Sequence, residues 1–144
     1  MATFERTFSL SVPSSTQNLA LVRDFVSGVG AQAGLNESEV ANLELAVDEA
    51  CANVMEHAYG DDASKEVVLR LIFDEETLRI HVIDTGRGFD PDDVRQEEIK
   101  QLAANRKTGG MGMRIIKLVM DEVHYDITPG EKNELQMVMK LKKS

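Results

Sequence analysis

The chain has 144 residues, the size of one domain, and its 42% hydrophobic and 28% charged residues argue against disorder. A formal charge of −9, from 25 acidic and 16 basic residues, argues against a nucleic-acid surface, which needs clustered cations, and favours a basic protein partner. The start of the sequence lacks signal-peptide features, and no stretch approaches the roughly 18 apolar residues of a membrane span, so we expect one cytoplasmic domain over residues 1–144 without membrane contact.

The first predicted elements are a strand and a helix. Apolar residues in a broken alternation predict a strand over residues 4–12. Ser14 or Ser15 can then cap a helix, whose apolar residues recur at intervals of three and four. These apolar residues are Leu19, Val22, Phe25, Val26 and Val29. Gly34 is typical of a helix end, so we expect the helix to end before Leu35.

A second helix is predicted as far as His57. It begins at an approximate capping box between Asn36 and Glu39. At about 100° per residue, its apolar side chains form one stripe that can face a core. The stripe consists of Val40, Leu43, Val47, Ala50, Cys51, Val54 and Ala58. Cys51 is the only cysteine, so no intrachain disulfide can form, and we expect it to be a core thiol.

The hydrophobic period then changes to that of strands. Residues 67–73 and 78–84 are predicted to form a hairpin around the turn DEET. The mostly polar segment 92–108 is long for a plain connection, which is typical of a lid or binding loop. A short helix and two strands, joined by TPGEKN, follow over residues 113–120, 123–127 and 135–141. This order predicts an α+β fold in which helices cover one face of a mixed, mostly antiparallel sheet.

Two polar residues of the second helix are candidates for a functional site. Glu49 and Asn53 lie four residues apart and share one flank of the helix. A carboxylate and a carboxamide in this arrangement are suited to contact a reacting group and a bound metal ion. The alternative at this point is a pair of solvated residues beside a core helix. For His57, a packed or substrate-side position is favoured, since one histidine makes a poor zinc site.

A glycine-containing turn, Asp84-Thr85-Gly86-Arg87-Gly88, follows the second strand of the hairpin. At a strand end, the carboxylate of Asp84 can accept a hydrogen bond from the amino group of a nucleotide base. Gly86 and Gly88 let the backbone approach a ligand closely. A tight turn without a ligand is the alternative interpretation.

A second glycine-rich turn precedes the short helix and consists of Lys107, Thr108, Gly109, Gly110, Met111, Gly112 and Met113. At a helix N-terminus, unpaired amides and the helix dipole attract phosphate. A flexible hinge is the alternative. Arg106 and Lys107 either meet phosphates or form a solvated basic pair, and Thr108 either contacts a nucleotide or caps the helix.

Taken together, these stretches resemble a known family. EACAN and VMEH, then DTGRGFDP, then GGMGM leading into IIKLVMDEV are similar to the three sequence boxes of the GHKL ATPase superfamily. Within it, the chain most resembles the bacterial anti-sigma-factor serine/threonine protein kinases. The resemblance implies the Bergerat fold, a two-layer α/β sandwich that is also called the histidine-kinase-like ATPase fold. It further implies that ATP and Mg²⁺ are bound, under a lid at approximately residues 89–109.

The resemblance also implies a role for each matching residue. Glu49 corresponds to the general base and Asn53 to the magnesium ligand of the family. Asp84 corresponds to the aspartate that reads adenine, with Gly86 and Gly88 in the loop under the purine. The residues implied to contact phosphate are Lys107, Thr108, Gly109, Gly110, Met111, Gly112 and Met113.

The function implied by the resemblance is that of an anti-sigma factor. Such a protein phosphorylates an anti-anti-sigma protein of the STAS type, binds a sigma factor and is often a homodimer. A histidine-kinase-like ATPase domain from another pathway is an alternative, although no histidine precedes His57 to act as a phosphoacceptor. Another alternative is a non-enzymatic module whose binding to partner proteins is controlled by nucleotide. Such a module would not need a base at Glu49.

Overall fold

The structure is a computed structural model, and it describes residues 4–58, 65–84, 112–128 and 132–141. The strands are β1 (Arg6–Pro13), β2 (Glu66–Phe73), β3 (Thr77–Asp84), β4 (Glu122–Thr128) and β5 (Lys132–Lys140). The helices are α1 (Leu19–Gln32), α2 (Glu37–Asn53) and α4 (Gly112–Val119), with a 3₁₀ turn η1 (Thr16–Asn18) before α1 and a π-helical turn η2 (Val54–Ala58) after α2.

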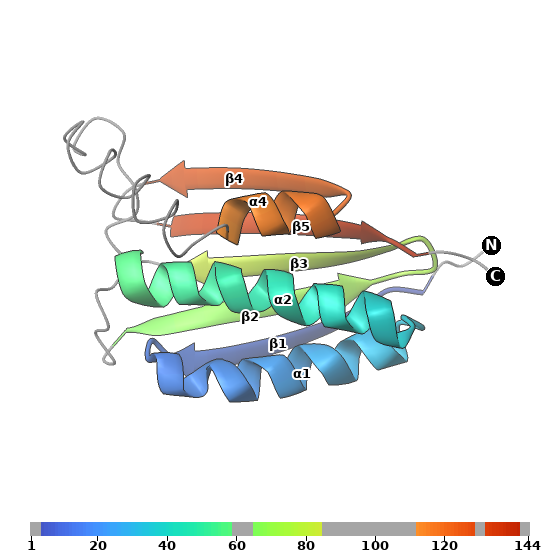
Figure 1. The fold of residues 1–144 in the computed structure, drawn as a ribbon, viewed down its shortest axis with the longest axis horizontal. Coiled ribbons are helices and arrows are strands. Elements are labelled where there is room, and N and C mark those ends of the chain that lie inside the picture. Colours follow the sequence, from blue (N-terminus) through green and yellow to red (C-terminus); the bar gives the residue numbers. More distant parts are fainter. Residues whose placement is uncertain (1–3, 59–64, 85–111, 129–131, 142–144) are drawn as a thin grey trace.

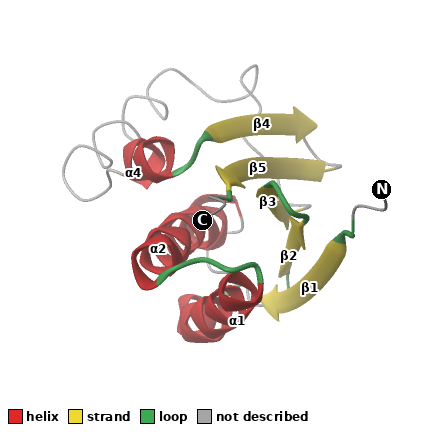
Figure 2. Cartoon of the chain, turned by 90° about the vertical axis from the view of Figure 1, so that its right-hand side faces the viewer, coloured by secondary structure: helices red, strands yellow, loops and turns green. Residues whose placement is uncertain are grey.

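The five strands form one sheet in the order β1-β2-β3-β5-β4. Each of the four described pairings is antiparallel. Helices α1, α2 and α4 lie on one side of this sheet (Figure 2). The predicted two-layer α/β arrangement is therefore confirmed, and among the described strands no parallel pairing occurs.

The core lies between the helices and the covered face of the sheet. Buried and less buried residues alternate along β2, β3 and β5, so every second side chain points toward the helices. The helical side of the core includes the predicted stripe of the second helix, in which Leu43, Val47, Ala50, Cys51 and Val54 are buried, together with buried residues of α1 and α4. Met55, which the stripe did not include, is also fully buried. No helix in the described part of the chain is long and apolar enough to cross a membrane.

Helix α2 begins at the predicted capping box. The side chain of Asn36 accepts a hydrogen bond of 2.8 Å from the backbone N–H of Glu39, and the Glu39 carboxylate accepts one of 3.1 Å from the backbone N–H of Asn36. Both bonds satisfy amides that a helix N-terminus leaves unpaired. Helix α1 ends before Leu35, as predicted. The predicted serine cap was wrong, because the chain enters α1 through η1 and neither Ser15 nor Asn18 caps with its side chain.

This difference between the two helix starts gives a test. We expect Asn36→Ala to lower the free energy of unfolding by about 1 kcal/mol, because it removes the side-chain acceptor of the cap. Ser15→Ala is the matched control and should change the free energy by much less, since Ser15 makes no capping bond. Urea unfolding followed by circular dichroism measures both values. Equal losses in the two variants would show that the capping box does not stabilise α2.

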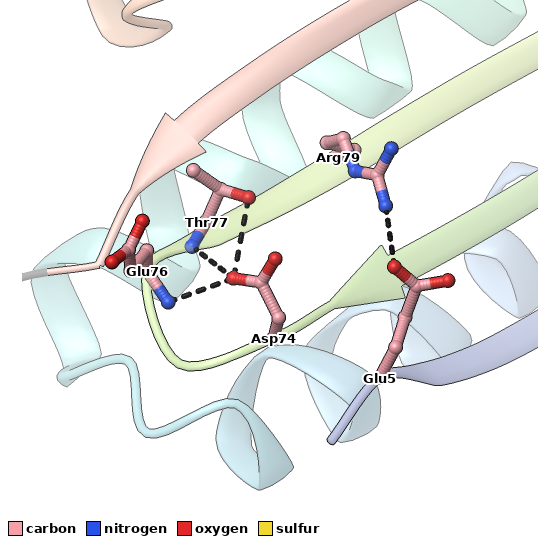
Figure 3. A network of polar contacts seen from close by, with 5 residues as sticks. All are labelled: Glu5, Asp74, Glu76, Thr77 and Arg79. Carbon is pink, nitrogen blue, oxygen red and sulfur yellow. Dashed lines mark hydrogen bonds and ion pairs between the residues drawn. The ribbon is translucent and has the colours of Figure 1, made fainter. Parts of the chain in front are cut away.

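The turn between β2 and β3 is fixed by one carboxylate. Asp74 Oδ1 accepts hydrogen bonds from the backbone N–H groups of Glu76 (2.7 Å) and Thr77 (2.8 Å), as Figure 3 shows. These bonds hold the pKa of the Asp74 carboxyl below its ordinary value, since they favour the charged form. In the same view, Arg79 on β3 pairs with Glu5 at 2.9 Å. The predicted hairpin turn is thus confirmed.

Candidate functional site

Several chain segments with candidate residues meet at one end of the sheet. In Figure 1, the C-terminal end of α2, the C-terminal end of β3 and the start of α4 all lie on the left of the molecule. Helix α4 starts at Gly112, as expected for a glycine-rich turn that leads into a helix. Asn53, Asp84 and Gly112 therefore lie at the same end of the domain, although far apart in the sequence.

Glu49 and Asn53 both lie in the last turn and a half of α2, and both side chains are partly buried. Asn53 is the last residue of the α-helix, and the chain continues as the π-helical turn η2. Single π-helical turns are frequent at functional sites. The expectation of a regular α-helix through His57 was wrong in this turn, and the side chain of His57 lies outside the described residues.

The surroundings of Glu49 are acidic. Partial burial raises the pKa of its carboxyl above the ordinary value, and the like charges of Asp48 and Glu56 raise it further. Asp48 itself is held by Arg23 of α1, with 2.6 Å between Nη1 and Oδ1. A carboxyl with a raised pKa is a better proton acceptor than an ordinary glutamate, which is a property of a general base.

Cys51, which lies between Glu49 and Asn53 in the sequence of α2, belongs to the core. It is fully buried, and this burial together with the charge of Asp48 raises the pKa of its thiol to about 12. A thiol that stays protonated is neither a nucleophile nor a metal ligand. The prediction of a core thiol is confirmed.

Asp84 is the last residue of β3 and points toward the helices. Only 4% of it is exposed, and its Oδ1 accepts a hydrogen bond of 2.9 Å from Nδ2 of Asn133 on β5. The two residues are direct partners in the register of β3 and β5. A buried carboxylate is stable only where hydrogen bonds replace its lost water, and this pair provides one such bond.

Asn133 is the residue of this region that the sequence did not reveal. We expected TPGEKN to form a turn and the last strand to start at Leu135, but β5 starts at Lys132 and extends to Lys140. The alternation of residues along the sequence could have predicted this earlier start. Every second residue, namely Asn133, Leu135, Met137 and Met139, lies on the covered face of the sheet. An asparagine at the first such position reads as a turn residue when the sequence is considered alone.

Several predicted site residues lie outside the described residues. These are Gly86, Gly88, Arg106, Lys107, Thr108, Gly109, Gly110 and Met111, together with the expected lid at 89–109. Gly112 is the first residue of α4, and the side chain of Met113 is not described. The expected contacts of these residues with phosphate therefore stay predictions.

The residues at the end of α2 fit a hard divalent cation such as Mg²⁺. The side-chain oxygen of Asn53 is a donor of the type that Mg²⁺ prefers, and a cation there would reduce the repulsion among Asp48, Glu49 and Glu56. Within the described ranges, no three histidine, cysteine, aspartate or glutamate side chains come together as a metal cluster. Mg²⁺ commonly takes most of its ligands from phosphate and water.

Comparison with known proteins shows which protein family the chain belongs to. A family model described as the histidine kinase-like ATPase domain matches residues 12–139, which is most of the chain. The chain belongs to this family, and its resemblance to the GHKL ATPases is confirmed.

Within this family, the chain is similar in sequence to proteins of one kind. The chain is 30% identical over 132 residues to "Serine-protein kinase RsbW" of Listeria monocytogenes serotype 4a (strain HCC23), a match that covers 88% of this chain and 84% of the relative. It is 33% identical over 122 residues to the protein of the same name in Bacillus subtilis (strain 168), covering 79% and 74% of the two chains. Over most of its length the chain is thus similar to serine-protein kinases.

Solved structures agree on the fold. One match is the crystal structure of the RsbU and RsbW domains of Rv1364c from Mycobacterium tuberculosis, with a TM-score of 0.68 and 16% identity. It covers 96% of this chain and 33% of that chain. Another match is the histidine kinase domain of the blue-light activated histidine kinase of Erythrobacter litoralis EL346, with a TM-score of 0.54 and 21% identity. It covers 96% of this chain and 68% of that chain.

Proposed function

We propose that this chain is an ATP-dependent serine/threonine protein kinase that acts as an anti-sigma factor. The single observation that carries the proposal is the position of Glu49, a carboxylate with a raised pKa, one helical turn before Asn53 and at the end of the sheet where Asp84 is buried. The similarity to serine-protein kinases over most of the chain supports the same activity.

In the proposed reaction, each residue has one task. Asp84 accepts a hydrogen bond from the exocyclic amino group of adenine, and the side-chain oxygen of Asn53 holds the metal. When bound, Mg²⁺ neutralises charge on the phosphates. Glu49 accepts the proton of a serine hydroxyl as the serine oxygen bonds to the γ-phosphorus and ADP departs with the bridging oxygen. Most of the acceleration comes from positioning and from charge stabilisation.

The proposed partners follow from the class of protein. The phosphoryl acceptor is an anti-anti-sigma protein of the STAS type, and the sequestered protein is a sigma factor. We place the protein in the cytoplasm, where ATP and both partners would be found, and propose that it functions as a homodimer. The net charge of −9 supports a basic protein partner.

The direct test is to incubate the protein with Mg²⁺, ATP and a candidate STAS-type protein, and to follow phosphoserine in the acceptor by mass spectrometry. The kinase proposal predicts magnesium-dependent transfer to one serine or threonine. The rival proposal of a non-enzymatic module predicts ATP binding without transfer to any acceptor that binds. Binding of a sigma factor is measured separately, by co-elution on size exclusion with and without ATP.

A pH profile tests the assignment of the base. Glu49 must be deprotonated to accept a proton, so transfer should rise with pH through the pKa of Glu49, and this rise should lie above the range of an ordinary glutamate. Glu56→Gln removes one like charge and should move the rise to lower pH. The shift should be small, because Glu56 is exposed and its charge is screened. A shift to higher pH would contradict the assignment.

A further inference from the structure

Asn133 occupies a position where the fold alone would favour another residue. Only 2% of it is exposed, and it lies on the covered face of β5 directly opposite Asp84. The next pair along this face, Val82 and Leu135, is apolar and buried. Asparagine is disfavoured in strands, and a buried carboxamide is unfavourable unless it is hydrogen-bonded. The identity of residue 133 therefore needs an explanation beyond packing.

The hydrogen bond to Asp84 supplies that explanation, and its direction is fixed by chemistry. Of the two polar groups of a carboxamide only the amino group donates, and Nδ2 of Asn133 donates to Oδ1 of Asp84, so the amino group and not the carbonyl oxygen faces the acceptor. The bond of 2.9 Å between Nδ2 and Oδ1 joins two side chains that face each other on neighbouring, hydrogen-bonded strands. The carboxamide is thus a fixed donor at the rim of the candidate site.

The orientation of the Asp84 carboxylate needs such a donor. The torsion that rotates a carboxylate about its last carbon–carbon bond has a broad energy minimum, so the plane of the group is poorly defined by its own preferences. A ligand amino group in a buried site is recognised well only if the accepting oxygen already points in the right direction. A neighbouring N–H held on a strand defines that direction before the ligand arrives.

We propose that Asn133 is a positioning residue for nucleotide recognition, which orients the carboxylate of Asp84 so that it selects a purine with a 6-amino group. This inference rests on the proposed function, in which Asp84 reads adenine. It makes residue 133 on β5 part of the specificity of a site whose other residues include Glu49 and Asn53 on α2 and Asp84 on β3. Asn133 acts through Asp84 and does not itself contact the phosphates.

The test compares two nucleotides that differ only at the 6-position: ATP and purine riboside triphosphate, which has hydrogen in place of the amino group. Affinities are measured by isothermal titration calorimetry with Mg²⁺ on the full chain. The parent protein should prefer ATP by about tenfold or more, as expected for a hydrogen bond to a charged group. A parent without this preference would contradict the proposed role of Asp84, and the inference about Asn133 with it.

The variants then test Asn133 by itself. Leucine has a volume similar to that of asparagine but no hydrogen-bond donor. In Asn133→Leu, the ratio of the affinity for ATP to that for purine riboside triphosphate should fall toward one, while the affinity for purine riboside triphosphate stays within about twofold of the parent. Asn133→Ser keeps a shorter donor and should retain part of the preference. Gln136→Leu is the matched control, because Gln136 lies on the same strand and donates to a different carboxylate, that of Glu134. Its preference should equal that of the parent.

Two results would overturn the inference. An unchanged preference for ATP in Asn133→Leu would show that Asp84 selects the base without this bond. Equal losses of affinity for both nucleotides would show that Asn133 only maintains the local structure. If Asn133→Leu does not fold, as judged by circular dichroism, Asn133→Ser decides the question: a reduced preference supports the inference, and a full one contradicts it.

Discussion

Replacing Glu49 by glutamine should reduce phosphoryl transfer about 100- to 10,000-fold while ATP binding remains close to that of the parent. Glutamine keeps the shape and the polarity of the side chain but cannot take the proton of the acceptor hydroxyl. The pKa of Glu49 is raised because partial burial, and then the like charges of Asp48 and Glu56, disfavour its carboxylate form, so losing the charge should not destabilise the fold. Single-turnover transfer from labelled ATP and calorimetric ATP binding measure the two quantities.

Glu44→Gln is the matched control for this experiment. Glu44 lies on the same helix, is also partly buried and precedes Glu49 by five residues, which places it on another flank of α2. It should transfer phosphate like the parent. Equal transfer by Glu49→Gln and the parent would show that Glu49 is not the base, and a parallel loss of ATP affinity would assign it to nucleotide binding.

Replacing Asn53 by alanine should remove most of the stabilisation that Mg²⁺ and ATP give to the parent. At a ligand concentration about one hundred times the Kd, binding stabilises a protein by about 2.7 kcal/mol. For a domain of this size, that corresponds to a rise in Tm of roughly 5–10 °C. Asn53→Ala lacks the proposed metal ligand, so its Tm should rise much less, as followed by differential scanning fluorimetry.

The control for Asn53 is a carboxamide at the other end of the molecule. Gln32 is the exposed last residue of α1, far from the end of the sheet where α2 and β3 finish (Figure 1). Gln32→Ala should show the full rise in Tm with Mg²⁺ and ATP. A full rise in Asn53→Ala as well would mean that the metal is held elsewhere, and that Asn53 is a solvated end of its helix.

The fold was largely predictable because its elements follow strong local periods. The stripe from Leu43 to Val54 matches the helical repeat, and it is buried as expected. The hairpin of β2 and β3 was predictable from two alternating segments around an acidic turn, and Asp74 does form that turn. These patterns are local in the sequence, so they can be recognised without knowledge of tertiary contacts.

The predictions that failed concern two changes of helix type and one contact between residues far apart in the sequence. The change to a π-helical turn after Asn53 was not predicted from the pattern of apolar residues, and Met55, which lies outside the predicted α-helical stripe, is fully buried in that turn. Asn133 looks like a turn residue until β3 brings Asp84 beside it, 49 positions away in the chain. The serines before α1 resemble caps, but the chain enters that helix through a 3₁₀ turn.

The candidate site was only partly predictable from the residues themselves. Glu49, Asn53 and Asp84 are polar residues at the ends of regular elements, and that position alone does not distinguish a ligand site from a solvated surface. Their resemblance to the GHKL boxes assigned roles to them, and the family match supports the class. What the structure adds is the shared end of the sheet, the burial of Asp84 and the acidic surroundings of Glu49.

The central claim is that this end of the sheet binds ATP for transfer to a serine. The most direct measurement is a crystal structure of the protein with Mg²⁺ and a non-hydrolysable ATP analogue. It should show the 6-amino group of adenine bonded to Asp84, the metal on the side-chain oxygen of Asn53, and Glu49 facing the γ-phosphate. A nucleotide bound on the uncovered face of the sheet, or one that touches neither Asp84 nor Asn53, would contradict the claim.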